Sequence, residues 1–531
     1  MPVSSWRQRP LLAIAAAALL LGTLAALHVA QLDLTLSHYD ARGHLAVARR
    51  IFDSITPGWQ QVGAVWLPLP HLLNALPVQI DALYRTGASA VAISIVSFAV
   101  ATTAIAWIIA SLTGSWLAAT TGAAVFALNP NVLYLQATPM TEPLLIALTV
   151  ASIALLLARC EFVVGSEDPT LRTSNEVRRV GSLDPTNTDP TTESPTNNRD
   201  WGRYTPSAGL VGWVFALACL TRYEAWPVTI GSLVAAMWVL TRRQVPAARA
   251  AQAIGAVAVY PVAAILGFSV FSRVVIGNWF ASGFFVPENP AEGHPLDAVR
   301  QILWGVRELS GTGLFIAATA GLLILAGRAL LIRERAANIL PLALLGTAAV
   351  PWSAFVDGHP YRIRYMVPLI AAQAICAGIA AGSWRFGRPA LVALLLAVAA
   401  YELRPMTLSA PMVVEAQWDR PNAAVRGTVT ACLKDGYRGE SVMASMGSLG
   451  HYMQDLSRAG FSISDFLHEG NGDIWLNALN SPRPYAGWIV IEEKAEGGDM
   501  LARIARERPG FLEGYSRICE GAGLALYRRG N

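Results

Sequence analysis

Residues 11–29 read LLAIAAAALLLGTLAALHV, an apolar run without a single Asp, Glu, Lys or Arg. As a helix rising about 1.5 Å per residue, it is about 28 Å long, close to the ~30 Å hydrocarbon core of a bilayer. Ten further apolar segments follow at residues 88–112, 117–135, 141–158, 207–221, 225–240, 250–272, 312–331, 337–356, 366–384 and 388–402. The sequence therefore predicts a polytopic α-helical membrane protein with about eleven spans.

The composition of the whole chain indicates the same class. Of the 531 residues, 54% are hydrophobic and 14% are charged, and the mean hydropathy is +0.42. A soluble protein of this size carries roughly 25% charged residues. This deficit of charge excludes an ordinary cytosolic enzyme, a nucleic-acid-binding protein and a disordered scaffold.

The arginines predict the orientation of the spans. Arg7 and Arg9 precede the first span, and no small-residue cleavage site follows it, so we expect an uncleaved span with a cytoplasmic N-terminus. With this orientation, sixteen of the arginines before residue 404 lie in cytoplasmic segments and ten in outer segments. The excess on the cytoplasmic side is the one that the positive-inside rule predicts. Residues 161–206 are rich in Thr, Asn, Pro and Asp, and we expect them to form a disordered cytoplasmic linker. We expect the membrane to be a bacterial plasma membrane.

Residues 1–404 form the expected transmembrane domain, and the chain changes character at residue 405, where charge rises and apolar runs shorten. We expect strands at 441–446 and 487–492, helices at 422–434, 449–459 and 499–508, and a closing hairpin from 518–519 and 524–528. A small α/β domain at 405–531 follows, and after eleven spans it is extracytoplasmic. Its GSLG stretch (447–450) could cradle an anion or form a plain tight turn.

The five cysteines form neither a disulfide framework nor a metal site. Cys160, Cys219 and Cys376 lie in or beside apolar runs, where cysteine acts as a small hydrophobic residue. No pair has the C-x-x-C spacing of zinc ligands. Cys432 and Cys519 lie in the C-terminal segment and could pair in an oxidising compartment or remain free thiols. The sequence leaves both states open.

The unusual polar clusters share one predicted face of the membrane. With eleven spans, the outer side carries SHYDARGH (37–44) continuing to ARR (48–50), NPN (129–131) to PMTEP (139–143), TRYEAWP (221–227), FFVPENP (284–290) and DGHPYRIRY (357–365). Ionisable groups near the ends of spans are costly to bury, so they tend to be paired or functional. This gathering on one face is the main functional signal in the sequence, and it depends on the span count.

The residue types in these clusters suit reactions of a lipid-linked sugar phosphate. A carboxylate such as Asp40, Glu142 or Glu224 can act as a general base toward a hydroxyl. Arginines can hold a phosphate through paired hydrogen bonds, and aromatic rings can stack on sugars. The lipid tail would lie in the bilayer and the head group on this face. Because phosphate is a good leaving group, no general acid is needed. None of these steps requires a metal, so we expect no cofactor, with a divalent cation left open.

The first cluster also carries a resemblance to a known family. The residues DARGH (40–44) and ARR (48–50), followed by Gly63, WLPL (66–69) and His71, resemble the first outer loop of the GT-C glycosyltransferases. This superfamily includes the protein O-mannosyltransferases and the bacterial aminoarabinose transferases. The stretches NP (129–130) and TEP (141–143) are similar to their second outer loop, so the resemblance covers roughly residues 1–300.

The resemblance implies a GT-C-like fold and the inverting transfer of a single sugar from a polyprenyl-phosphate donor to an acceptor hydroxyl on the outer face. It also implies a catalytic acidic residue at the position of Asp40. Two positions depart from the family pattern. Ala41 occupies the position where the family often has a second acidic residue. Trp66 lies near the position at which the related lipid A enzymes carry a lysine. Arginines would therefore have to replace that lysine at the phosphate.

These considerations assign a role to each candidate site residue. Asp40 is the expected catalytic base, with a helix cap or an ion pair as the structural alternative. Glu142 is the second expected catalytic residue, binding the acceptor or orienting a base, with a cap at a helix N-terminus as the alternative. The expected substrate-binding residues are Arg49, Arg50, Arg222, Tyr223, Glu224, Arg362 and Arg364. Arg222 could instead pair with Glu224, and the last two arginines could instead anchor lipid headgroups.

A polytopic transporter or lipid flippase is the alternative function. Transporters usually show repeated halves with broken helices, and they need charged groups near mid-membrane. No internal repeat is visible and the charged clusters are one-sided, which favours the transferase. The expected partners are a polyprenyl-phosphate sugar, an unidentified hydroxyl acceptor (a protein, a lipid or a glycan) and membrane lipid, with no nucleic acid.

Overall fold

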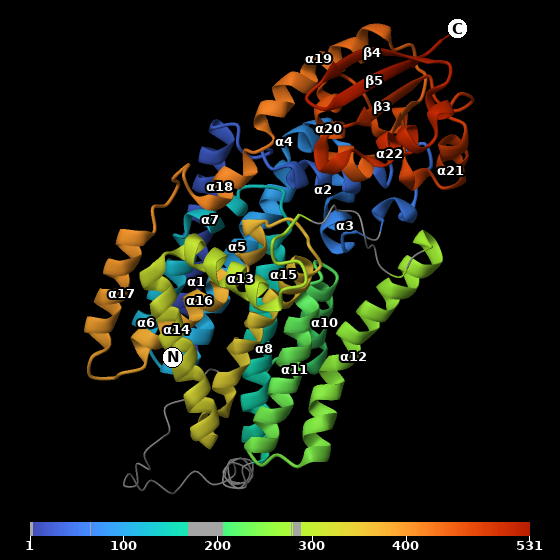
Figure 1. Ribbon diagram of the computed structural model, residues 1–531. Coiled ribbons are helices and arrows are strands. Elements are labelled where there is room, and N and C mark those ends of the chain that lie inside the picture. The colour runs from blue at the N-terminus through green and yellow to red at the C-terminus, as the bar shows by residue number, and fades with distance from the viewer. Residues whose placement is uncertain (1–3, 64, 168–204, 278, 280–287, 531) are drawn as a thin grey trace, which may run out of the picture.

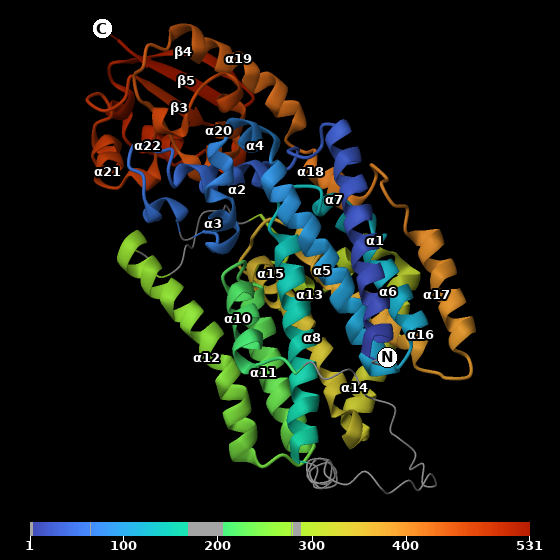
Figure 2. The same cartoon turned by 180° about the vertical axis from the view of Figure 1, so that it is seen from behind.

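The computed structural model describes residues 4–63, 65–167, 205–277, 279 and 288–530. Long helices form a bundle, and an α/β domain lies at one end of it (Figure 1). The connection between α11 (Ala225–Arg242) and α12 (Ala247–Phe271) lies at the opposite end, as the reverse view also shows (Figure 2). Short helices of the loops fill the level between the bundle and the α/β domain.

Among the described residues, seven helical segments are long and apolar enough to cross a membrane. They are Arg9–Gln31 in α1 (Ser4–Gln31), Ala88–Thr113 (α5), Glu142–Gly165 in α8 (Glu142–Glu167), Ala247–Ile276 (α12 with η4, Ser272–Ile276), Thr312–Leu331 (α14), Arg333–Val356 (η5, Arg333–Ala348, with α15, Ala349–Val356) and Ile363–Gly382 (η6, Ile363–Met366, with α16, Leu369–Gly382). The chain therefore has the helical membrane-protein architecture that its apolar runs predict.

The four remaining expected spans fall on shorter helices. These are α6 (Trp116–Ala127), α10 (Ala208–Cys219), α11 and α17 (Arg388–Glu402), which have between 12 and 18 residues. The total of eleven spans therefore stays a prediction. The expected linker is corrected at its start, because α8 continues to Glu167. The rest of that linker, residues 168–204, lies outside the described residues.

The expected continuous span at 117–135 is wrong, because it is divided into α6 and α7 (Pro130–Leu135). Asn129 caps the second helix, and its side-chain oxygen accepts the backbone N–H of Asn131 at 2.9 Å. Proline at the next position lacks the N–H that a continuous helix would need. The side-chain amides of Asn129 and Asn131 both donate to the carbonyl of Leu309, at 2.9 and 2.8 Å. The polar side chains of this turn are thus hydrogen-bonded inside the protein.

Small residues set the spacing of the central helices. A Cβ atom added to Gly321 in α14 would lie only 1.8 Å from the carbonyl oxygen of Cys376 in α16. Glycine at this point lets the two backbones touch, as small residues do between membrane helices. The turn from α5 to α6 uses Gly114 in the left-handed conformation, φ 67°, and Ser115 as the helix cap. The glycine at the helix contact and the Gly-Ser turn therefore both suit the close packing of the bundle.

The C-terminal residues form a five-stranded sheet in the order β2-β1-β3-β5-β4. Its strands are β1 (Val442–Ala444), β2 (Phe466–Leu467), β3 (Trp488–Glu492), β4 (Tyr515–Gly521) and β5 (Leu524–Arg529), and its helices are α19 (Arg420–Gly436), α20 (Met446–Arg458), α21 (Asp473–Asn480) and α22 (Met500–Glu507). β1 pairs in parallel with β2 and β3, and the closing hairpin is antiparallel. The expected strands, helices and hairpin are present, whereas β2 and α21 are additions.

Two local features of this domain decide between alternatives that the sequence leaves open. Cys432 of α19 and Cys519 of β4 form a disulfide. The GSLG stretch is not an anion cradle, because it lies within the first turns of α20 and the N-terminus of that helix is already occupied. The carboxylate of Glu469 accepts the N–H of Met446 at 2.9 Å and the hydroxyl of Ser445. An internal anion therefore fills the position that an external one would take.

Candidate active site

Asp40 lies in the first turn of α2 (Tyr39–Arg50), and only 8% of its surface is exposed. The helix begins there because Nδ1 of His38 accepts the backbone N–H of Asp40 at 3.1 Å. The carboxylate pairs with the guanidinium of Arg364 from η6. Burial by itself raises the pKa of Asp40, but the charge of Arg364, assisted by His38 and His44, lowers it to about 2. Asp40 is therefore ionised at neutral pH.

A second cluster joins the second predicted outer loop to the third. Glu142 begins α8 and is completely buried. Nη1 of Arg222 lies 3.1 Å from Oε1 of Glu142 and donates to the hydroxyl of Thr141 at 3.0 Å. Nη2 of the same side chain lies 2.8 Å from Oε1 of Glu224. The predicted pairing of Arg222 with Glu224 is thus present, and Glu142 belongs to the same cluster.

His44 connects the two clusters. It lies one helical turn after Asp40 on α2 and is buried. Burial and the neighbouring His71 hold its pKa well below the usual value, and the charges of Asp40, Arg222 and Arg364 also act on it. His44 and Thr141 line the same small cavity, and Thr141 is the residue whose hydroxyl accepts from Arg222. Both carboxylate–arginine clusters therefore lie close to one imidazole.

His44 and His71 form a neutral pair beside Trp66. Nδ1 of His44 lies 3.1 Å from Nε2 of His71, and the rings of His44 and Trp66 are 4.1 Å apart. Nδ1 of His71 lies 3.1 Å from the carbonyl of Leu67, which assigns its proton to that nitrogen. Burial lowers the pKa of His71 to about 3. A cavity of about 20 Å³ next to the pair has room for about one water molecule.

Arg50 differs from the other predicted phosphate-binding arginines. Its Nε donates to the carbonyl of Gln61 at 2.5 Å, and it forms no ion pair within the described ranges of the chain. Burial lowers its pKa to about 10, against the opposing charge of Glu469. After burial itself, the charge of Arg50 is what lowers the pKa of His71 and of His468, each to about 3. The Arg50 guanidinium is thus a partly buried cation without a carboxylate partner among the described residues.

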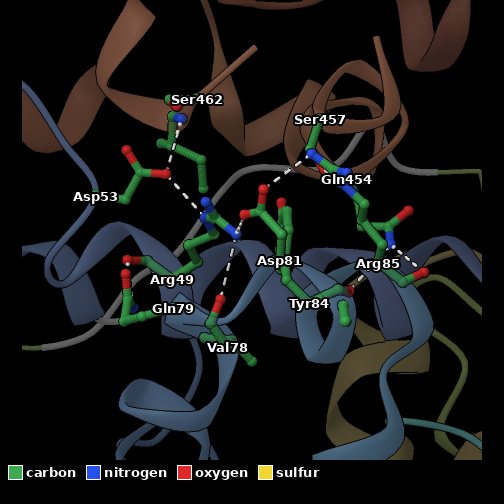
Figure 3. A network of polar contacts seen from close by, with 12 residues as sticks. Arg49, Asp53, Val78, Gln79, Asp81, Tyr84, Arg85, Gln454, Ser457 and Ser462 are labelled. Carbon is green, nitrogen blue, oxygen red and sulfur yellow. Dashed lines mark hydrogen bonds and ion pairs between the residues drawn. The ribbon is translucent and has the colours of Figure 1, made fainter. Parts of the chain in front are cut away.

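Arg49, by contrast, belongs to a contact with the C-terminal domain (Figure 3). Its guanidinium lies 2.8 Å from Asp53 and 2.7 Å from Asp81, and it packs over the ring of Tyr84. The Asp53 carboxylate also accepts the backbone N–H of Ile463 at 3.2 Å. These contacts already occupy the Arg49 guanidinium. Its predicted role in substrate binding stays a prediction, and the geometry favours a structural role.

The C-terminal domain also holds α2 through Arg42. This side chain donates to Asp419 at 2.5 Å and to Asp455 at 2.7 Å. Leu45 and Ala48 of the same helix share a hydrophobic core with α20 and with β1 and β3. One side of α2 therefore packs on the C-terminal domain, while its polar residues Asp40 and His44 belong to the site in the bundle.

The remaining predicted binding residues lie at the rim of the two clusters. Arg362 interacts with the hydroxyl of Tyr39 and stacks over the ring of Trp418, 5.6 Å from its centroid. The rings of Tyr223 and Trp226 meet edge to face at 5.2 Å. Burial raises the pKa of Tyr223 to about 12, so this phenol stays protonated.

Sequence reasoning missed several residues of this site. His38 and Glu415 approach each other at 3.7 Å, and Glu415 accepts the backbone N–H of Ile363 at 2.7 Å. Asp419 and His451, both from the C-terminal domain, lie beside Arg42 and Tyr39. A carboxylate at 415 within the apolar stretch PMVVEA was a visible signal. For Asp419 and His451 there was none, because nothing local marks them.

No candidate metal centre occurs in the part of the chain that the structure describes. The described residues contain no group of three or more His, Cys, Asp or Glu side chains placed to hold an ion. The expected independence of metal therefore stays a prediction.

Comparisons with known proteins find similarity in structure alone. No family model and no curated protein matches the chain. ArnT from Cupriavidus metallidurans bound to undecaprenyl phosphate is similar with a TM-score of 0.57 and 12% identity, over 99% of this chain and 98% of that chain. Its apo state gives 0.55 and 13%, over 97% of both chains. An oligosaccharyltransferase from Archaeoglobus fulgidus gives 0.46 and 11%, over 98% of this chain and 74% of that chain.

The two ArnT structures decide the fold. The likeness extends over nearly all of both chains, so it includes the C-terminal domain as well as the bundle. At 12–13% identity, it is a likeness of architecture and not of individual side chains. The chain therefore has the fold of the membrane-embedded GT-C glycosyltransferases.

Proposed function

We propose that the protein transfers a single sugar, with inversion, from a polyprenyl-phosphate donor to an acceptor hydroxyl on the outer face of the membrane. The observation that carries this proposal is that two carboxylate–arginine clusters, Asp40 with Arg364 and Glu142 with Arg222, lie close to His44, which shares a small cavity with Thr141, the hydroxyl partner of Arg222. A neighbour of the same fold, ArnT, has been seen bound to undecaprenyl phosphate, which supports a donor of this class.

The side chains of α2 suggest where each part of the substrates binds. Arg50 and the pair of His44 and His71 offer a cation and two neutral imidazoles at one end of the site, which suits the donor phosphate. Asp40 lies about 6 Å from His44 and about 15 Å from Arg50 along the helix axis. The reacting carbon of the sugar is bonded to a phosphate oxygen, so it would lie directly beside the phosphate, on the side of the phosphate that faces Asp40. The acceptor would then approach from the N-terminal side of the helix.

Asp40 would act as the base even though its pKa is low. In the reaction, the acceptor oxygen bonds to the sugar carbon as the bond from that carbon to the phosphate oxygen breaks, and the phosphate leaves with the electron pair. The attacking hydroxyl becomes an oxonium, which is far more acidic than an alcohol. A carboxylate with a pKa of about 2 can accept that proton late in the reaction, without first deprotonating the free alcohol.

Glu142 would position Arg222 and bind a sugar hydroxyl. Both of its carboxylate oxygens are buried and accept no hydrogen bond from any described residue, although Arg222 lies 3.1 Å away. Burying a carboxylate without hydrogen bonds is costly. A hydroxyl of the bound sugar would donate a hydrogen bond to the Glu142 carboxylate and so remove that cost. This interaction would form only when the sugar is bound.

The disulfide supports the proposed sidedness. Disulfides persist in oxidising compartments and are rare in the cytoplasm, so the Cys432–Cys519 bond supports an extracytoplasmic C-terminal domain. Because this domain packs directly on α2, the active site would lie on the same side. In a bacterium this is the outer face of the plasma membrane.

Label transfer in membranes tests the proposal. Membranes enriched in the wild type, Asp40→Asn or the control Asp297→Asn would receive a panel of radiolabelled polyprenyl-phosphate sugars and native acceptor extract. Asp297 lies on α13 (Pro295–Ser310), where its side chain pairs with Arg300. We expect transfer by the wild type and the control, and a loss of about 100-fold or more in Asp40→Asn. Equal transfer by all three would remove Asp40 from the mechanism. Absence of transfer from every carrier would favour the transporter or flippase.

A further inference from the structure

An unassigned aromatic and polar cluster lies where the C-terminal domain meets the N-terminal turn of α2. Trp418, between α18 (Pro411–Ala416) and α19, is 53% exposed. Arg362 stacks over part of its ring at 5.6 Å, which leaves the exposed part accessible. Tyr39 interacts with Arg362, and its ring meets that of His451 edge to face at 6.4 Å.

The cluster is connected to α2 by residues that are adjacent in the chain and by an ion pair. Tyr39 directly precedes Asp40 in the chain. Asp419 directly follows Trp418 and pairs with Arg42 of α2 at 2.5 Å. His451 lies on α20, which packs against α2 so closely that a Cβ atom on Gly450 would lie 4.0 Å from the backbone of Gly43. A molecule bound to this cluster would therefore be next to Asp40, on the side opposite to Arg50.

The chemistry of the cluster suits a neutral ring with hydroxyl groups. One face of a sugar ring presents C–H groups, which pack on the electron-rich face of an indole. Arg362 supports the indole by a cation–π contact and offers N–H donors at its edge. Burial lowers the pKa of His451 to about 3, so its imidazole is neutral at neutral pH and can both donate to and accept from hydroxyls.

We propose that Trp418, Tyr39 and His451 form the acceptor subsite, and that the acceptor is a saccharide whose ring stacks on Trp418. This inference rests on the proposed function, because the acceptor hydroxyl must reach Asp40. It gives the C-terminal domain a specific role in binding, since that domain supplies two of the three ligand-binding side chains. It also chooses a glycan or glycolipid over a protein among the possible acceptors.

The experiment measures binding separately from catalysis. Purified full-length protein in nanodiscs would be applied to an array of immobilised glycans and hydroxyl-rich peptides. The variants are Trp418→Ala, Trp418→Phe, His451→Gln and the control Trp384→Ala, whose indole is 61% exposed and lies between α16 and α17. We expect the wild type to bind a subset of glycans, Trp418→Ala to bind them about tenfold more weakly, and Trp418→Phe to recover most of the affinity.

Kinetics with a glycan from that subset then give the second readout. Trp418→Ala should raise the KM for this acceptor about tenfold, with an unchanged kcat and an unchanged KM for the donor. The subsite is wrong if no glycan binds, if only peptides bind, or if Trp418→Ala and Trp384→Ala behave alike. Glycan binding that depends on Trp418 without any sugar transfer would uphold the subsite and contradict the proposed function. Sugar transfer that Trp418→Ala leaves unchanged would support the proposed function and contradict the subsite.

Discussion

At the scale of single residues, the arginines of the site differ in the partners that they already hold. Arg222 and Arg364 each pair with a buried carboxylate, and Arg49 pairs with two carboxylates. Removing one partner of a buried ion pair typically costs about 3–5 kcal/mol, so a phosphate gains little by displacing one. Arg50 would give up only a hydrogen bond to a carbonyl. This difference favours Arg50 over these three arginines as the phosphate ligand of the proposed reaction.

The pH dependence of an Arg364 variant tests the pairing with Asp40. In the wild type, the Asp40 carboxylate has a pKa of about 2, so it is ionised at every pH above about 3. In Arg364→Gln the cation is lost, and burial then raises the pKa of this carboxyl above its ordinary value. The ratio of kcat/KM for Arg364→Gln to that of the wild type should therefore fall as the pH is lowered from about 8 to about 5. Label-transfer rates across this range measure it.

The exposed Arg300 provides a control for that experiment, since it pairs only with Asp297 on the surface of α13. Arg300→Gln should give a ratio that does not change with pH. Three neighbouring histidines do not titrate across this pH range, because the pKa of His71 and of His451 is about 3 and that of His44 is also well below its usual value. A ratio for Arg364→Gln that is independent of pH would contradict the ion pair.

At the scale of elements, α2 is the centre of the arrangement. Its twelve residues carry Asp40 and His44 toward the bundle and place Leu45 and Ala48 in a core shared with the C-terminal domain. The helix is too short and too polar to span a membrane. The C-terminal domain contacts it through Asp419, which pairs with Arg42, and through Ile463, whose backbone N–H donates to Asp53, the partner of Arg49. The C-terminal domain therefore holds α2 in place as well as covering it.

The disulfide between α19 and β4 should stabilise this domain strongly. It joins residues that are 87 positions apart, and cross-linking a loop of that length contributes about 4.6 kcal/mol in the chain-entropy model. We expect the double variant Cys432→Ser/Cys519→Ser to lose about that much stability. Urea unfolding of the full chain in detergent, followed by proteolysis of the C-terminal residues, measures it. Cys160→Ala is the control, and equal midpoints for both variants would contradict the expectation.

At the scale of the whole molecule, the polar site and the C-terminal domain gather at one end of the bundle (Figures 1 and 2). The α11–α12 connection marks the other end. The 25-residue α12 begins at that connection, and a helix of this length can cross the hydrocarbon core of a bilayer. The charged clusters of separate loops thus meet at one level, which a transport pathway open to both faces would not require.

Cysteine labelling tests this orientation in intact cells. Asn477→Cys places a thiol on α21 in the C-terminal domain, and Ala247→Cys places one at the start of α12; both positions are exposed. The unpaired native cysteines Cys160, Cys219 and Cys376 are buried, so the background should be low. We expect a membrane-impermeant maleimide to label position 477 in intact cells and position 247 only after permeabilisation. The reverse pattern would place the site on the cytoplasmic side.

Much of the architecture could be predicted because its signals are local. A run of apolar residues specifies a membrane helix by its length, and the period of the C-terminal segments specified β1, β3 and the closing hairpin. The sequence failed where a short polar motif interrupted a run, as at Asn129, which divides an expected span in two. It also missed β2, because two buried residues between turns carry no recognisable period.

The sequence by itself determined the membrane class, the polar clusters and Asp40 as the leading candidate. The tertiary structure alone decided which arginines are already paired and that Trp418 and His451 lie beside Tyr39. Arg42 and Asp419, which connect these parts, are 377 residues apart. Local patterns fix only what depends on neighbours in the chain. The pairing of charges depends on which side chains packing brings within a few ångströms, and that is a property of the folded molecule.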